Sequence, residues 1–240
     1  MGTLMSQPVQ LSLPVVLDDQ ATFDSFFCAD QPLLSGVVDQ LRGLAHPDAE
    51  LCIFLWGEEG SGRSHLLQAT CHHFISEGLS AQYLPLAELA ELPPESLLAD
   101  LEQQQLICLD DVDAIAEDPV WQEALFHLFN RSRALGHRLV FSARMAPRQL
   151  PLTLEDLRTR LEWGLVFHLP SLGDEDKLAL LQWCSLRRGL KLEREVAEYI
   201  LRRAPRRMAE LLAVLAQLDR ESLLQQRRLT IPFVRATLGW

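Results

Sequence analysis

Residues 57–64 have the composition and spacing of a phosphate-binding loop. They read Gly-Glu-Glu-Gly-Ser-Gly-Arg-Ser and lie between an apolar run, 51–56, and a segment with helical character, 65–74. Glycines allow positive φ and bring backbone N–H groups close to phosphate oxygens, and the helix that follows adds the positive end of its dipole. The residues expected to bind a nucleotide are Gly57, Gly60, Ser61, Gly62, Arg63, Ser64 and His65.

Arg63 is the one departure from the usual G-x-x-x-x-G-K-[ST] pattern, in which lysine precedes the hydroxyl residue. A guanidinium binds phosphate as a planar fork rather than as a compact charge, so the substitution favours holding a nucleotide over fast hydrolysis. Ser64 is expected to place its hydroxyl on Mg²⁺. Glycine-rich turns are common without a ligand, and it is the flanking strand and helix that favour a nucleotide site here.

A pair of carboxylates follows a second apolar run. Residues 106–109 are Leu-Ile-Cys-Leu, and Asp110 and Asp111 come next. Such a run is typical of a central parallel strand, whose carboxyl end would lie beside the phosphate loop. We expect Asp110 to hold the water shell of Mg²⁺ and Asp111 to orient an attacking water. The alternative is an ordinary strand-ending turn.

Composition indicates a globular protein in a reducing compartment. The chain has 240 residues, of which 48% are hydrophobic, enough for one large domain or for a medium and a small one. Its five cysteines lie far apart in no metal or disulfide pattern, which favours a cytoplasmic location. No signal peptide or membrane-spanning run is apparent, so we expect no membrane partner.

Charge argues against general nucleic-acid binding and is unevenly distributed. The net charge is −11, so we expect little direct DNA binding. Residues 1–120 hold 20 acidic side chains against Arg42 and Arg63, whereas residues 121–240 hold 20 basic side chains against 13 acidic ones. One interpretation is two solvated faces of one globule. The other is a molecule with opposite faces, suited to head-to-tail association, including self-association.

The order of elements predicts an α/β domain followed by a helical one. We expect five parallel strands near 51–56, 80–84, 106–109, 139–142 and 165–169. Helices are expected at 30–44, 65–74, 94–101, 119–135 and 155–164, and, beyond Pro170, at 174–188, 193–203, 206–219 and 232–238. The expected domains are an extended arm at 1–20, an α/β nucleotide-binding domain at 21–170 and a helical lid at 171–240.

These features together resemble the AAA+ ATPases. Four segments look like the central domain of the replication initiators of the DnaA family: Thr22-Phe-Asp-Ser-Phe26, Leu109-Asp-Asp-Val112, Arg160-Leu-Glu-Trp-Gly164 and Leu229-Thr-Ile-Pro-Phe-Val234. The chain ends where that family would begin its DNA-binding domain, and it opens with Gln10-Leu-Ser-Leu-Pro14, which resembles a sliding-clamp-binding peptide. On its pattern alone this arm is better explained as a tail that packs on its own domain, and it is the resemblance of the rest of the chain that favours the clamp-binding peptide. The combination is similar to the Hda group of DnaA-homologous regulators.

The resemblance implies a function and residue roles. It implies regulation of replication initiation, in which the chain binds the sliding clamp through Gln10, Leu11, Leu13 and Pro14 and stimulates ATP hydrolysis by ATP-bound DnaA. Arg160 matches the arginine finger that reaches a neighbour's nucleotide. The implied cofactors are ADP, or ATP, with Mg²⁺.

Two positions depart from the family pattern. Ala209 stands where the lid arginine is expected, with Arg206 and Arg207 as neighbours. The acidic residue of the first sensor is replaced by Ala143 and Arg144, which leaves Ser142 as the nearest polar candidate. Two other functions stay open: a self-acting AAA+ ATPase such as a helicase loader or an initiator-like protein, and a P-loop small-molecule kinase.

Overall fold

The computed structural model describes residues 17–29, 31–205 and 207–240, so the predicted clamp-binding residues 10–14 lie outside it. Backbone contacts divide the chain into two compact units. The larger holds most of the residues up to Leu169, and the smaller holds 170–240 with the short stretches 27–32 and 59–61.

A five-stranded parallel sheet organises the larger unit. Its strands are β1 (Cys52–Trp56), β2 (Ala81–Pro85), β3 (Leu106–Asp110), β4 (Arg138–Ala143) and β5 (Leu165–His168). They are ordered β2-β3-β4-β1-β5, so that β1 lies between β4 and β5 and β3 lies between β2 and β4. All the carboxyl ends therefore meet at one edge, the edge at which open α/β sheets bind ligands.

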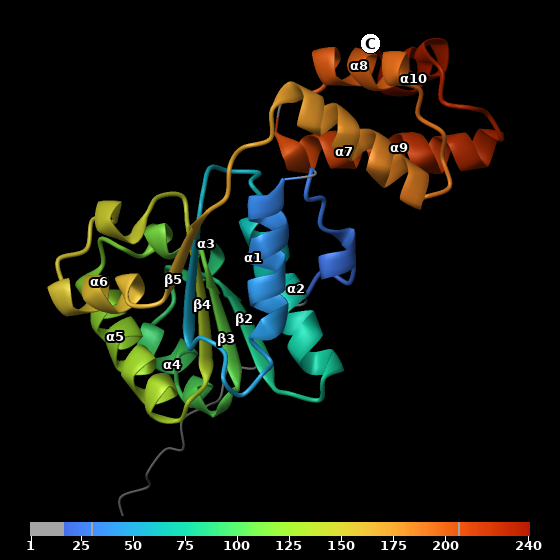
Figure 1. Cartoon of the computed structure of the whole chain (residues 1–240). Coiled ribbons are helices and arrows are strands. Elements are labelled where there is room, and N and C mark those ends of the chain that lie inside the picture. The colour runs from blue at the N-terminus through green and yellow to red at the C-terminus, as the bar shows by residue number, and fades with distance from the viewer. Residues whose placement is uncertain (1–16, 30, 206) are drawn as a thin grey trace, which may run out of the picture. The chain divides into compact units, whose positions relative to one another are not determined.

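The central strands are apolar because both faces of the sheet are covered. Every residue of β3 and β4 is buried. Figure 1 shows α1 (Pro32–Gly43) and α2 (Arg63–Ser76) on one face of the sheet and α5 (Pro119–Ala134) and α6 (Glu155–Glu162) on the other. Alternate residues of each strand point to opposite layers, which is why these runs show no polar alternation.

The start and the buried face of helix α5 both follow from its local sequence. Asp118 caps it, its carboxylate accepting a hydrogen bond from the Val120 N–H at 2.8 Å, and Pro119 occupies the first helical position. Trp121, Leu125 and Phe129 recur at intervals of four and are buried against the sheet.

Gly164 allows the chain to enter β5. A Cβ at this position would lie 2.0 Å from the carbonyl oxygen of Cys52 on β1, so the backbone approaches the strand more closely than any side chain permits. Glycine is therefore required where α6 is joined to the sheet.

The smaller unit contains four helices among its described residues. They are α7 (Asp174–Arg187), α8 (Arg194–Arg203), α9 (Met208–Gln225) and α10 (Ile231–Leu238). Their buried faces form one apolar core in which Leu181, Ile200, Leu215 and Phe233 are almost fully enclosed. Thr230 caps α10 by accepting a hydrogen bond from the Phe233 N–H.

The predicted fold class is confirmed, with five parallel strands and a helical C-terminal unit. The single helix predicted over 94–101 is wrong. Helix α4 covers only Pro94–Leu97, and Asp100 takes a φ of +58° before a 3-10 turn at Leu101–Gln103. The short α3 (Leu86–Leu89) was not predicted, and α9 continues to Gln225, beyond the predicted end at 219.

The five cysteines are all free. Within the described part of the chain, no helix combines the length and the apolar character needed to cross a membrane.

Candidate nucleotide-binding site

The phosphate loop runs from the end of β1 to the first turn of α2. Gly60 and Gly62 adopt φ of +83° and +92°, in the left-handed region that favours glycine. Gly62 is also the N-cap of α2. Because it has no side chain, no cap oxygen accepts a hydrogen bond from the first N–H groups of the helix. A Cβ at Gly62 would lie 2.6 Å from the ring of Phe26, so glycine is favoured here by the space available as well as by its φ. Free N–H groups at a helix start are suited to phosphate oxygens.

Arg63 is the first residue of α2 and is only 6% exposed. Its Nη2 donates to Asp111 Oδ1 at 3.0 Å, whereas its Nη1 is buried and has no partner among the described residues. A buried guanidinium nitrogen without an acceptor is costly, and an anionic oxygen is the group that satisfies it best. One edge of the guanidinium is therefore held by the protein and the other remains available for phosphate.

Asp111, which pairs with Arg63, has an uncommon backbone conformation and a shifted pKa. It adopts a φ of +55°, uncommon for a residue with a side chain. Burial and the neighbouring charge of Asp110 raise the pKa of the Asp111 carboxyl, and Arg63 partly offsets that rise. The cation therefore favours the charged form of a carboxylate that its surroundings disfavour.

Asp110 is the last residue of β3, and its carboxylate is 2% exposed. Its Oδ2 accepts a hydrogen bond from the Tyr83 hydroxyl at 2.7 Å, and its Oδ1 accepts one from the Ser142 hydroxyl. Ser142 Oγ in turn accepts from the Asp111 N–H at 3.0 Å. Ser142, expected as the nearest first-sensor candidate, thus contacts both acidic residues directly.

Ser64 and Asp110 offer the oxygen donors that Mg²⁺ prefers. The Ser64 hydroxyl makes no hydrogen bond to the described part of the chain, so it is free to bind a cation. No group of three or more His, Cys, Asp or Glu side chains among the described residues could hold a metal alone. The residues therefore fit a magnesium ion that is shared with nucleotide phosphates.

His65 faces the segment that precedes the sheet. Its Nε2 lies 2.9 Å from the Thr22 carbonyl oxygen and 3.3 Å from Ser25 Oγ. The centroid of its ring lies 5.5 Å from that of Phe26, and the two rings are tilted by 55°. Thr22 and Ser25 also cap each other around a 3-10 turn. The structure thus shows His65 holding the 22–26 segment, and its direct contact with a nucleotide stays a prediction.

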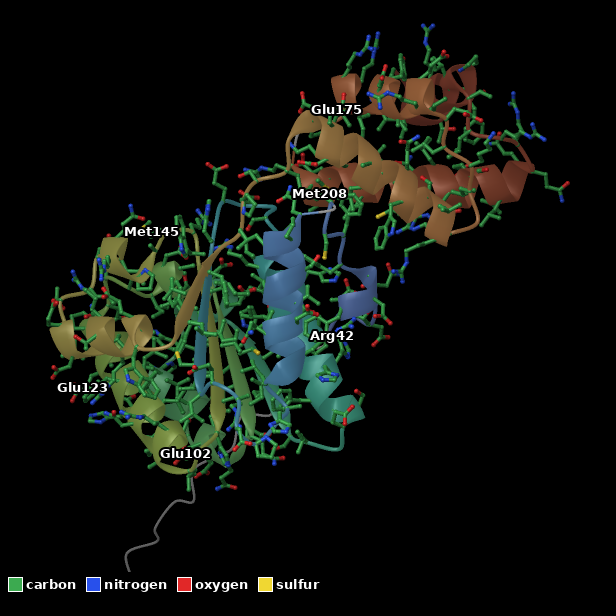
Figure 2. The ribbon with its side chains drawn as sticks, in the orientation of Figure 1. Arg42, Glu102, Glu123, Met145, Glu175 and Met208 are labelled. Carbon is green, nitrogen blue, oxygen red and sulfur yellow. The ribbon has the colours of Figure 1, made fainter. Side chains whose placement is uncertain are left out.

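The same face of α2 holds the start of the described chain. Gln68 Oε1 accepts from the Asp18 N–H at 2.8 Å, and His72 Nε2 lies 3.0 Å from the Asp18 carbonyl oxygen. Together with His65 these side chains recur at helical spacing on one face. Arg42, which is labelled in Figure 2, lies at the end of α1, and its Nη2 pairs with Asp24 Oδ1 at 2.7 Å. The segment from residue 18 to residue 26 is therefore fastened along the helix that begins at the phosphate loop.

Arg160 lies in the last turn of α6 and is half-buried, and its guanidinium makes no hydrogen bond or ion pair with the described residues. Arg158, on the same helix, lies 3.7 Å from Glu155 and also donates to the Leu152 carbonyl. Two residues correspond to about 200° around a helix, so the two arginines point to different sides.

The two positions that depart from the family pattern are also placed. The Arg144 N–H donates to Asp113 at 3.0 Å, and its guanidinium lies 3.5 Å from the same carboxylate. Ala209 is exposed in the first turn of α9. Arg207 is the N-cap of that helix and precedes its first turn, which corrects the expectation of a helix starting at 206.

Comparison with known proteins identifies the family. Residues 17–168 match the model of the bacterial DnaA ATPase domain, and residues 174–238 match the model of the Hda lid domain. The chain belongs to the DnaA family. It is an AAA+ protein of the Hda/DnaA type, related to replication initiation and built to bind a nucleotide.

Solved structures share its fold. Domain III of the replication initiation protein DnaA from Thermotoga maritima is 20% identical with a TM-score of 0.76, covering 93% of this chain and 98% of that one. AMPPCP-bound DnaA from Aquifex aeolicus is 22% identical with a TM-score of 0.71, covering 85% and 66%. A RuvB mutant from Thermotoga maritima is 14% identical with a TM-score of 0.66, covering 91% and 71%.

Proposed function

We propose that this protein is a regulator of replication initiation that stimulates ATP hydrolysis by ATP-bound DnaA and so prevents re-initiation. Its arm, through Gln10, Leu11, Leu13 and Pro14, would bind the sliding clamp on DNA. The match of residues 174–238 to the Hda lid model supports this choice among DnaA-type proteins. The bond that is broken belongs to the partner's ATP.

The guanidinium of Arg160, which has no charged partner among the described residues, supports this proposal most directly. A finger that acts on a neighbouring subunit needs a guanidinium that its own chain does not neutralise. Arg160 has no ion pair among the described residues, whereas Arg158 is paired with Glu155. Arginine stabilises charge on a transferring phosphoryl group, an effect of roughly 10³–10⁵ in rate for other NTPases.

The chain's own site is proposed to hold ADP, or ATP, rather than to turn it over rapidly. The loop from Gly57 to Ser64 would bind the phosphates, with Arg63 offering its free Nη1. Asp111, expected to orient a water, already accepts from Arg63, and Asp110 already accepts from two hydroxyls. These hydrogen bonds favour a site that holds its nucleotide over one that hydrolyses it rapidly, with Mg²⁺ held by Ser64 and Asp110.

Charge favours a directed encounter between subunits. Arg160 belongs to the half of the chain with 20 basic and 13 acidic side chains, and a DnaA-type partner would present its own phosphate-loop half. Opposite charges increase association rates and are screened by salt beyond a Debye length of about 8 Å at physiological ionic strength. Stimulation should therefore weaken as salt rises.

A self-acting ATPase is the second candidate. Asp110 and Asp111 at the carboxyl end of β3, beside Arg63 of the phosphate loop, favour it. In that case the isolated protein would release phosphate from ATP without any partner.

Reconstitution separates the two functions. ATP-bound DnaA is incubated with this protein, with or without a clamp loaded on DNA, and released phosphate is counted. The proposed regulator accelerates hydrolysis only when the loaded clamp is present. If this protein alone released phosphate from ATP as fast as the mixture with DnaA and loaded clamp, that result would instead establish the self-acting ATPase.

A further inference from the structure

The Asp110 carboxylate is held from both neighbouring strands. Because β3 lies between β2 and β4, each neighbour can supply a donor. Tyr83 of β2 donates to Oδ2 at 2.7 Å, and Ser142 of β4 donates to Oδ1. With one donor on each oxygen, the carboxylate cannot rotate without losing a hydrogen bond in a site that is 2% exposed.

Both donors are fixed in that role. Tyr83 is 8% exposed, and its hydroxyl lies 2.7 Å from a carboxylate oxygen, which can only accept, so the tyrosine is the donor. Ser142 Oγ accepts the Asp111 N–H at 3.0 Å, which directs its own proton toward Asp110.

We propose that Tyr83 is a positioning residue for the magnesium–nucleotide complex and acts through Asp110. A carboxylate whose two oxygens are each fixed by a protein donor presents its remaining lone pairs in set directions, ready for the hydration shell of a divalent cation. Partners that orient a ligand carboxylate in this way commonly change metal affinity by about 10–100-fold when removed. This inference rests on the nucleotide role proposed for Ser64 and Asp110.

The experiment uses calorimetry on the full chain, with ADP titrated in the presence of Mg²⁺ and again in EDTA. The ratio of the two affinities measures the contribution of the metal. Tyr83→Phe removes only the hydroxyl and should lower this ratio about ten-fold while leaving the affinity in EDTA within about two-fold of wild type. Ser142→Ala, which removes the donor to the other oxygen, should lower the ratio in the same direction.

Tyr199→Phe is the matched control. Tyr199 lies on α8 in the other unit, and its hydroxyl is buried without a partner among the described residues. This variant should leave both affinities unchanged. Thermal unfolding of each variant in the absence of nucleotide shows that the fold is retained.

Three results would overturn the inference. An unchanged ratio in Tyr83→Phe would make the hydroxyl a packing contact only. An equal loss of affinity with and without the metal would indicate a general disturbance of the site. A wild-type protein that binds ADP equally well with and without Mg²⁺ would leave Asp110 with no cation to position. None of these results depends on the clamp or on DnaA, so failure here is separate from failure of the proposed regulatory function.

Discussion

Replacing Arg63 with alanine tests the phosphate loop, and the structure sets the size of two separate effects. The first is on nucleotide affinity. Arg63 Nη1 is buried without an acceptor among the described residues, so a phosphate oxygen would gain a charge-assisted hydrogen bond. Such bonds contribute about 1.5–3 kcal/mol, and their loss should weaken ADP binding by about ten-fold or more.

The second effect is on stability. Without Arg63, the Asp111 carboxylate loses its cation at 3.0 Å. The Asp111 side chain is 26% exposed, so water can solvate part of the charge, and the loss should be near 1 kcal/mol rather than the roughly 3–5 kcal/mol of a fully buried pair. Urea unfolding without nucleotide measures it.

A double variant separates the two effects. Arg63→Ala combined with Asp111→Asn removes the unpaired charge together with the guanidinium. Stability should return toward the wild-type value, whereas ADP affinity measured by calorimetry should stay low. Unchanged affinity in the Arg63→Ala protein would exclude Arg63 from phosphate binding, because the loop would then be structural or the nucleotide would bind elsewhere.

Three further changes test other parts of the molecule. Replacing Leu11 and Leu13 with alanine should abolish clamp binding in a pull-down without changing ADP affinity, and wild-type retention on the clamp would contradict the role of the arm. Gly164→Ala should cost about 3 kcal/mol or more in urea unfolding, because its Cβ would lie 2.0 Å from a carbonyl of β1, whereas Gly36→Ala, with nothing within 4 Å on an exposed helical turn, should be neutral or stabilising by up to about 1 kcal/mol. Burial raises the pKa of Cys52 from 9.0 to about 12, so its thiol ionises first in the unfolded chain, and its contribution should lower the free energy of unfolding between pH 9 and 12 by about 1 kcal/mol per pH unit. Cys52→Ala should reduce that slope, and an equal slope in both proteins would exclude this thiol as the cause.

The sheet could be predicted because its central strands are buried on both faces. A short apolar run such as 106–109 is typical of a central parallel strand, and the glycine loop and acidic pair that follow two of these runs mark the carboxyl edge. The helix predicted over 94–101 failed for a local reason. Leu97 ends the helical turn, and Asp100 takes a left-handed conformation that sequence periodicity does not reveal.

The contacts within the site were harder to predict because they depend on strand order. Tyr83 and Asp110 are 27 residues apart and meet only because β2 pairs with β3. The signal that could have pointed to Tyr83 was its hydroxyl beside Leu84 in a predicted strand, since a hydroxyl that becomes buried needs a partner. The pairing of Arg63 with Asp111 likewise depends on the loop and β3 meeting at one edge of the sheet.

The proposed function depends on Arg160 acting on the nucleotide of another subunit. The most direct measurement is phosphate release by wild-type ATP-bound DnaA mixed with loaded clamp and either wild-type protein, Arg160→Ala or Arg158→Ala. The Arg160→Ala protein should keep its ADP affinity and its clamp contact yet fail to stimulate hydrolysis. Arg158 is the control because its guanidinium lies 3.7 Å from the Glu155 carboxylate on its own helix, and its variant should stimulate hydrolysis. Full stimulation by the Arg160→Ala protein would exclude a trans-acting role for Arg160 and leave the chain with a tethering role alone.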